Sequence, residues 1–217
     1  SAQCVFAQAA GDNAIPPPLT EYQGRMFAQS MNYTGAPWLT RESRQREEDC
    51  ETMIKELRIR AGMTVCDMGC GNGFYALKLA ELVGEKGQVL AVDIQSEMLH
   101  LLELRAKESG IENIKPLLGT VADPGLPAGQ VDLILCVDVY HEFSHPEQML
   151  AAMRTALKPD GQLVLVEFRA EDPNVPIKPL HKMTVQQVKA EMKAVGLVFA
   201  ELRDFLPTQH FLVFKKP

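Results

Sequence analysis

From Met63 to the C-terminus, short runs of consecutive apolar residues alternate with amphipathic stretches of helical period. Unbroken apolar runs are typical of strands that are buried on both faces of a parallel sheet. Strand–helix alternation of this kind predicts right-handed crossovers and an α/β fold with a doubly wound, mostly parallel sheet and helices on both faces. The expected strands are 65–68, 89–93, 114–118, 131–137, 163–168, 197–202 and 211–214, and the expected helices are 74–83, 97–109, 146–157 and 185–195.

The ends of these elements carry recognisable signals. Ser96 is a candidate cap for the helix after the second strand, and Gly110 is placed to end that helix. Thr184 with Gln187 forms a capping box, and Gly196 stands where a helix ends in a left-handed residue. The last two strands are joined by only about eight residues. Because this connection is too short for a helical crossover, the last strand is expected to be antiparallel to its neighbour.

The N-terminal part of the chain follows a different pattern. Residues 1–39 contain the triplet Pro16-Pro17-Pro18 and are interpreted as an extended arm and possible lid, and 40–217 as the main domain. A helix is expected from Thr40, its N-cap, toward Arg60. Only its second half carries apolar residues at helical spacing, so only that half is expected to pack on a core. Candidate lid residues are Tyr33, Trp38 and Arg41.

A glycine-rich turn follows the first strand of the alternating region. Residues 65–73 run from a strand through a glycine turn into a helix, and ligands of open α/β sheets bind beyond the carboxyl ends of the strands. The spacing is GxGxG, and Phe74 occupies the position that a dinucleotide fold gives to a small residue. Asp67 at the mouth of the turn would repel a pyrophosphate. It suits a ligand with an ammonium or sulfonium group, and S-adenosylmethionine (SAM) carries both.

Asp93 ends the second strand, twenty residues after Gly73. A carboxylate at this position can accept hydrogen bonds from both hydroxyls of a ribose. This feature fits a nicotinamide dinucleotide and SAM equally well. A nicotinamide-dependent oxidoreductase is therefore disfavoured by Phe74 and Asp67, and not by Asp93.

Four segments together carry a family resemblance: DMGCGNG at 67–73, VLAVDIQSEML at 89–99, the strand at 131–139, and LKPDGQLVLVEF at 157–168. They resemble class I SAM-dependent methyltransferases, and are most similar to the broad group that includes ubiquinone/menaquinone-biosynthesis methyltransferases. The resemblance covers roughly residues 61–168. It implies a Rossmann-like fold of seven strands with the last antiparallel, SAM as methyl donor and S-adenosylhomocysteine (SAH) as product. Residues predicted to bind this cofactor are Asp67, Gly69, Cys70, Gly71, Gly73, Asp93, Ile94, Met98, Val121, Ala122, Asp123 and Asp138.

One triplet departs from the pattern of the related enzymes. They often have Gly-Asp-Ala after the third strand, where the Asp meets the adenine amino group, whereas this chain has Gly119-Thr120-Val121. Asp123 could reach the adenine instead, or backbone groups around Val121 and Ala122 could do so. Since Asp123 precedes a proline in a turn, it could also simply cap that turn.

The segment DVYHEFSH at 138–145 directly follows the fourth strand, at the edge of the sheet where the methyl group is expected. His141 is the candidate catalytic base, because the ordinary pKa of imidazole lies near neutrality. Tyr140 could orient the acceptor or line the sulfonium face, and Glu142 could orient His141 or act itself. Weaker candidates at the same edge are Glu167, Arg169, His181 and Lys182.

Composition restricts the partners. The formal net charge is −6 and the sequence pI about 5.4, without the basic clusters that nucleic-acid binding requires. No apolar run approaches the ~20 residues of a membrane span. The five cysteines show no close CxxC pair and no histidine at zinc spacing, so neither a disulfide framework nor a metal site is predicted.

These observations predict an enzyme that transfers a methyl group from SAM to a small-molecule acceptor. The alternative is a SAM- or SAH-binding protein without turnover, such as a sensor or a degenerate enzyme. A cytoplasmic location is expected, unless residues 1–10, which contain the small-x-small triplet Ala7-Gln8-Ala9, are the remnant of a signal peptide.

Overall fold

The computed structural model describes residues 15–217, so residues 1–10 and Cys4 lie outside the described part. Seven strands form one sheet: β3 (Thr64–Met68), β4 (Gln88–Asp93), β5 (Ile114–Leu118), β6 (Val131–Val137), β7 (Leu157–Arg169), β9 (Val198–Arg203) and β10 (Gln209–Lys215). Their order is β5-β4-β3-β6-β7-β10-β9. All seven expected strands are present. An eighth strand of two residues, β8 (Lys182–Met183), adds to β7 and was not predicted.

The direction of the strands confirms the doubly wound prediction. The five strands from β5 to β7 pair in parallel, whereas β10 is antiparallel to both β7 and β9. The short link between β9 and β10 permits only a hairpin, as expected. Since all parallel strands point the same way, their carboxyl ends meet at one edge of the sheet.

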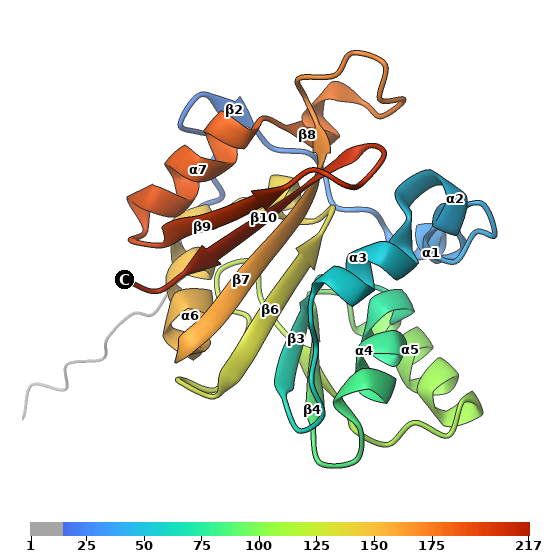
Figure 1. Cartoon of the computed structure of the whole chain (residues 1–217). Coiled ribbons are helices and arrows are strands. Elements are labelled where there is room, and N and C mark those ends of the chain that lie inside the picture. Colours follow the sequence, from blue (N-terminus) through green and yellow to red (C-terminus); the bar gives the residue numbers. More distant parts are fainter. Residues whose placement is uncertain (1–14) are drawn as a thin grey trace, which may run out of the picture.

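Helices cover both faces of the sheet, as Figure 1 shows. The helices are α4 (Phe74–Val83), α5 (Ser96–Glu108), α6 (Pro146–Ala156) and α7 (Val185–Ala194), together with the shorter α3 (Cys50–Glu56). Alternate residues of each strand belong to two separate cores: Val65 packs with α3, α4 and α5, whereas Cys66 packs with α6 and α7. None of the helices in residues 15–217 combines the length and apolar character needed to cross a membrane.

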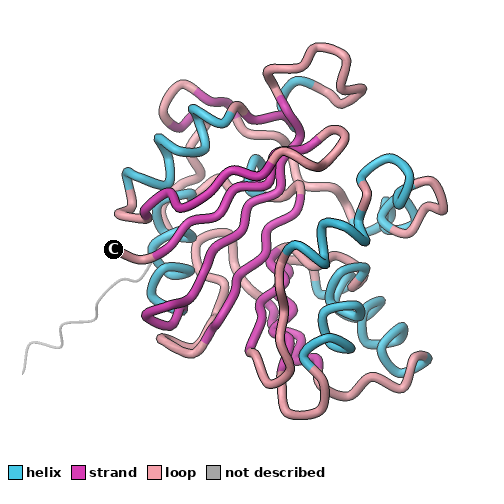
Figure 2. Tube along the Cα trace, in the orientation of Figure 1, coloured by secondary structure: helices cyan, strands magenta, loops and turns pink. Residues whose placement is uncertain are grey.

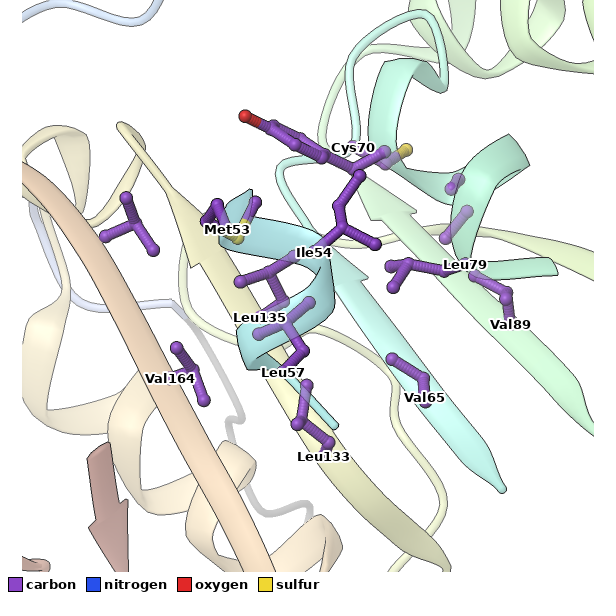
Figure 3. Packing of buried hydrophobic residues seen from close by; sticks show 14 of the residues in the cluster. Met53, Ile54, Leu57, Val65, Cys70, Leu79, Val89, Leu133, Leu135 and Val164 are labelled. Carbon is purple, nitrogen blue, oxygen red and sulfur yellow. The ribbon is translucent and has the colours of Figure 1, made fainter. Parts of the chain in front are cut away.

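Helix α3 covers the middle of the sheet. In Figure 3 its Met53, Ile54 and Leu57 lie over apolar side chains of β3, β6 and β7, among them Leu135 and Val164. These helical residues are nearly inaccessible to solvent. Their burial fixes the chain that leads into β3, and therefore the segment just before α3, which lies near the carboxyl edge.

The region expected to be one helix from Thr40 to Arg60 is instead broken. It contains α2 (Arg44–Glu48) and α3, and Thr40 ends the preceding α1 (Ala36–Leu39) rather than capping a helix. The break occurs at Asp49, which has a left-handed φ of 48°. The turn directs the polar first half inward, so that Arg44 and Glu48 are buried. The apolar core takes only residues of the second half, as expected, but the burial of Arg44 and Glu48 was not predicted.

Residues 15–39 cross the carboxyl edge of the sheet. They contain a two-residue hairpin, β1 (Glu21–Tyr22) with β2 (Arg25–Met26), and a short helical turn, η1 (Tyr33–Gly35). Arg25 makes a bidentate ion pair with buried Glu191 of α7, at 2.7 Å for both contacts. The backbone N–H of Ala28 donates to the carbonyl of His141 at 3.2 Å. This N-terminal arm is therefore held against the loops at that edge.

Apart from Thr40, the expected helix-end signals are present with one exception. The Thr184 hydroxyl accepts from the backbone N–H of Gln187, and Gly110 and Gly196 both have positive φ. Ser96, however, is the first residue of α5 and makes no cap. The Asp93 carboxylate accepts from the N–H of Gln95 at 2.9 Å instead, which satisfies the free backbone donor at this helix start.

Candidate functional site

A cavity of about 540 Å³ opens at the carboxyl edge of the sheet. Its wall combines the N-terminal arm, α2, the glycine turn, the ends of β4, β5 and β6, and the loop after β7. That loop extends beyond the upper end of the sheet in Figure 2. A cavity of this size and position is typical of small-molecule and cofactor sites in α/β proteins.

The glycine turn is anchored to the end of β4. The N–H groups of Gly69 and Cys70 donate to the carbonyl of Val92, and the N–H of Gly71 donates to the Asp93 carboxylate at 2.9 Å. Gly69 has a φ of 68°, and a Cβ added to it would lie 2.3 Å from Cγ2 of Val139. A side chain is therefore excluded here by both backbone conformation and space. The turn exposes bare backbone to the cavity.

Seven of the twelve predicted cofactor residues line the cavity: Gly69, Gly71, Asp93, Ile94, Met98, Val121 and Asp138. The other five, Asp67, Cys70, Gly73, Ala122 and Asp123, are not part of its wall. Cys70 is buried in the core of α3 and α4. A Cβ on Gly73 would lie 2.8 Å from side-chain atoms of Leu77 in α4 and Leu102 in α5. The lack of a side chain at Gly73 therefore allows these two helices to pack closely.

The turn after β5, where adenine recognition was predicted, is stabilised by side chains of its own residues. The Thr120 hydroxyl accepts from the N–H of Asp123 at 2.9 Å, and the Asp123 carboxylate accepts from the N–H of Gly125 at 2.8 Å. Asp123 is exposed and caps its own turn, which was one of the roles considered for it. Thr120 and Val121 are the residues of this turn that reach the cavity.

Two buried carboxylates beside the glycine turn have an unpaired oxygen. Within residues 15–217, Oδ2 of Asp67 and Oδ1 of Asp138 have no hydrogen-bond partner, although Asp138 accepts from the Gln209 amide through its other oxygen. Burial raises the pKa of Asp67 to about 7 and that of Asp138 well above its ordinary value. Buried unpaired carboxylate oxygens are costly unless a donor or a cation meets them. Of the two, only Asp138 lines the cavity, so its free oxygen is the one that can meet a hydrogen-bond donor or a positively charged group of a ligand.

Arg44 and Glu48 supply charges that the sequence interpretation missed. Arg44 donates to Glu48 at 2.9 Å and to the carbonyl of Leu39, while Arg41 donates to the other oxygen of Glu48 at 2.6 Å. Burial lowers the pKa of Arg44, but Tyr75 and Glu48 raise it more, so the guanidinium stays charged. Both arginines line the cavity. Arg41 was a candidate lid residue, but the positions of Arg44 and Glu48 along a polar stretch gave no signal, because the left-handed Asp49 that turns them inward could not be predicted.

At the opposite end of the cavity, His141 is fixed by Glu167. Nδ1 of His141 lies 2.6 Å from Oε2 of Glu167, and Oε1 of Glu167 accepts from the N–H of Tyr140 at 2.9 Å. Burial lowers the pKa of His141, but the Glu167 carboxylate raises it more, and the net shift is upward. Nε2 of His141 faces Nδ1 of His181 at 3.0 Å. His181 belongs to η3 (Pro179–His181), in the loop after β7.

The three predicted catalytic residues have different positions. His141 and Glu142 line the cavity, and burial raises the pKa of Glu142 to about 7. Tyr140 is buried outside the cavity wall, and its hydroxyl donates to Glu191 at 2.5 Å. Glu167, rather than Glu142, holds the Nδ1 of His141. Of the weaker candidates His181 reaches the cavity, whereas Lys182 donates to the carbonyl of Asp172.

Sequence comparison places this geometry among known proteins. The sequence model of a family described as "Methyltransferase domain" matches residues 59–206. An uncharacterized methyltransferase of Bacillus subtilis is 35% identical over 127 residues, which are 58% of this chain and 49% of the relative. The demethylmenaquinone methyltransferase of Listeria welshimeri is 29% identical over 126 residues, 58% of this chain and 52% of that protein. The matched region thus spans about half the length of these curated relatives.

Structural comparison extends the similarity over most of the chain. A SAM-dependent methyltransferase from Aquifex aeolicus has a TM-score of 0.80 and is 26% identical, and the match covers 85% of this chain and 98% of that one. The resemblance noted in the sequence therefore has the expected three-dimensional counterpart.

Proposed function

Because this chain belongs to the methyltransferase-domain family, we propose that it transfers the methyl group of SAM to a small-molecule acceptor. One observation carries the proposal. A single cavity joins the glycine turn and Asp93 at one end to a histidine fixed by a buried carboxylate at the other. Such an arrangement can hold a donor and an acceptor side by side.

The residues at the first end fit the parts of SAM. Asp93 can meet the ribose hydroxyls, although its oxygens also hold the N–H groups of Gly71 and Gln95. Arg44 can pair with the carboxylate of the methionine moiety, and the unpaired oxygen of Asp138 with its ammonium group. The apolar walls provided by Ile94 and Val121 suit an adenine ring.

The second end prepares an acceptor. SAM supplies a methyl group already activated by the sulfonium, so the protein has mainly to position the nucleophile and exclude water. A carboxylate can only accept a hydrogen bond, so Glu167 keeps the proton on Nδ1 of His141 and leaves a lone pair on Nε2. Nε2 faces Nδ1 of His181 at 3.0 Å, and both histidines line the cavity. Nε2 can therefore take a proton from the molecule that is to be methylated, or bind a cation in place of that proton.

The cover of the cavity favours a small acceptor. Met31 and Trp38 of the N-terminal arm and Ile177 of the loop after β7 all contribute to its wall. We propose that residues up to 39 act as a lid on the domain that begins at residue 40. The formal net charge of −6 argues against a nucleic-acid acceptor.

The test begins with calorimetric titration of the ligand-stripped protein with SAM, SAH and NADH. We expect micromolar binding of SAM and SAH and no binding of NADH. Folded protein that binds neither adenosyl ligand would overturn the proposal.

Transfer is then tested with tritiated SAM and a panel of phenols, catechols, amines and thiols. We expect SAH to form only in the presence of an acceptor. Tight SAM binding without transfer to any member of a broad panel would favour a binding protein without turnover.

A further inference from the structure

Three side chains with metal-binding atoms meet at the acceptor end of the cavity. His141, Glu142 and His181 each offer one ligand atom, and these atoms all lie within 4.8 Å of one another. His141 is buried and the other two are partly exposed. They come from two segments 40 residues apart, η2 (Tyr140–Glu142) and η3, so the contact is made by the fold and not by local sequence.

The first of these ligands is already oriented. Both oxygens of Glu167 are occupied, one by the N–H of Tyr140 and one by Nδ1 of His141 at 2.6 Å. This fixes the tautomer in which Nε2 of His141 is unprotonated and directs it toward His181. A carboxylate behind the second ring nitrogen is the arrangement that metal-binding histidines usually have, because it fixes the ring and raises its basicity.

The distance between the two imidazoles fits a shared ion. Nε2 of His141 and Nδ1 of His181 are 3.0 Å apart. Two nitrogens bound at about 2.1 Å to one ion lie about 3.0 Å apart at a right angle, and about 3.4 Å apart in a tetrahedral site. The same distance also fits a hydrogen bond between the rings. A hydrogen bond between the rings would not involve Glu142. A metal ion would, because the negatively charged carboxylate of Glu142 supplies a third ligand atom.

We propose that His141, Glu142 and His181 form a binding site for one divalent first-row transition-metal ion. Two imidazoles and one carboxylate suit zinc, iron, cobalt or manganese better than calcium or magnesium, which prefer oxygen ligands. Three protein ligands leave positions open for a further ligand. The sequence gave no indication of this site, because its histidines are not at a recognisable spacing.

A metal ion at this site would determine which class of acceptor is methylated. This consequence rests on the proposed function. An ion at the acceptor end binds a hydroxyl oxygen and lowers its pKa, so that the proton leaves to solvent at neutral pH. The oxygen then forms the new bond to the methyl carbon. The carbon–sulfur bond breaks, and its electron pair stays on sulfur as SAH is released. The preferred acceptor is therefore a hydroxyl compound with a neighbouring oxygen, such as a catechol or a hydroxycarbonyl compound.

The experiment is titration of chelator-treated, tag-free full-length protein with cobalt(II) chloride, without SAM. Visible absorption of the bound ion reports the coordination. We expect one ion per chain, displaced by zinc chloride. His181→Ala and Glu142→Gln should each abolish or shift the cobalt spectrum. Glu167→Gln should weaken binding by about 10–100-fold, as expected for a residue that orients a ligand.

His100→Ala is the matched control, because His100 is exposed on α5 and is not part of the cavity wall. Its cobalt spectrum should equal that of the unchanged protein. The proposal is overturned if protein that binds SAH binds no cobalt, or if binding survives both His181→Ala and Glu142→Gln. SAH calorimetry on the same preparation separates the two hypotheses, since loss of SAH binding with retained cobalt binding contradicts only the proposed function.

Discussion

The two ends of the cavity are built in different ways. At the glycine end, Gly69 and Gly71 belong to one continuous segment and present backbone groups that are held by the neighbouring strand β4. At the histidine end, His141, Glu167 and His181 come from three segments and act through their side chains. A backbone-built site is encoded locally and tolerates little change. A side-chain site depends on how distant segments pack, and single residues can be replaced without disturbing the other end.

The largest effect is expected from Gly69→Ala. The new Cβ would lie 2.3 Å from Cγ2 of Val139, and the φ of 68° disfavours any side chain. The turn must shift, and misplacement of a reacting group by about 1 Å can slow the reaction by about 100-fold. We expect the rate of methyl transfer to fall by about that factor, together with a loss of SAH affinity in calorimetric titration.

Gly125→Ala is the matched control for this substitution. Gly125 has almost the same φ, 67°, but nothing lies within 4 Å of an added Cβ. It should lower stability by roughly 1 kcal/mol and leave SAH affinity unchanged. If both variants bind SAH equally well, the lack of a side chain at Gly69 is not needed for ligand binding. The glycine end would then not be a site built from backbone groups.

A smaller loss is expected from Asp93→Ala. If Asp93 meets the ribose as proposed, removal of its carboxylate should weaken SAH binding by roughly 1–3 kcal/mol. Because Asp93 also holds Gly71 and Gln95, the thermal unfolding temperature should fall as well. Asp123→Ala removes a carboxylate that is not itself part of the cavity wall and, within residues 15–217, accepts only from the N–H of Gly125, and should change SAH affinity by less than about twofold. Equal effects of the two substitutions would show that the ribose assignment is wrong.

The glycine end and the fold could be predicted because both depend on local pattern. Apolar runs give the strands, and the short link before β10 gives its direction. Asp93 was found because an acid at the end of the second strand has few other roles. The broken helix at Asp49 could not be predicted, since a left-handed aspartate leaves no pattern in the sequence, and with it Arg44 and Glu48 were missed.

The histidine end was only partly predictable. His141 and Glu142 follow a strand that ends at the correct edge, which is enough to place them in the cavity. Tyr140 was expected beside them, but the short helical turn directs its hydroxyl to Glu191. Glu167 and His181 lie 26 and 40 residues from His141 along the chain, and their roles depend on how close the fold brings them to its imidazole ring. Such distances are set by packing and not by spacing along the chain.

Asp67→Asn should reveal a stability cost at the glycine end. Burial raises the pKa of Asp67 from 3.8 to about 7, so the folded protein holds this proton more tightly than the unfolded chain. The stability contributed by Asp67 is present below pH 4 and is lost as the pH rises through 7. At pH 8 the variant should therefore unfold with a free energy higher by up to about 4 kcal/mol, since each unit of pKa shift corresponds to about 1.4 kcal/mol.

The pH dependence separates this effect from a general change in packing. Chemical denaturation of both proteins at pH 5 and pH 8 should show a larger difference at pH 8. SAH affinity should change little in the same variant, because Asp67 is not part of the cavity wall. A stability difference that is equal at both pH values would mean that Asp67 does not carry a buried charge in the folded protein.

The smallest effect is expected from His141→Asn on SAH binding. The asparagine amide can still donate to Glu167 near the position of Nδ1, whereas the nitrogen that faces His181 is removed. If the two ends act independently, SAH affinity should change by less than about twofold while methyl transfer and cobalt binding are lost. A tenfold loss of SAH affinity, with unfolding unchanged, would mean that His141 packs against the methionine moiety of the cofactor. The histidine end would then be part of the cofactor site, and the division of the cavity into a backbone-built end and a side-chain end would no longer hold.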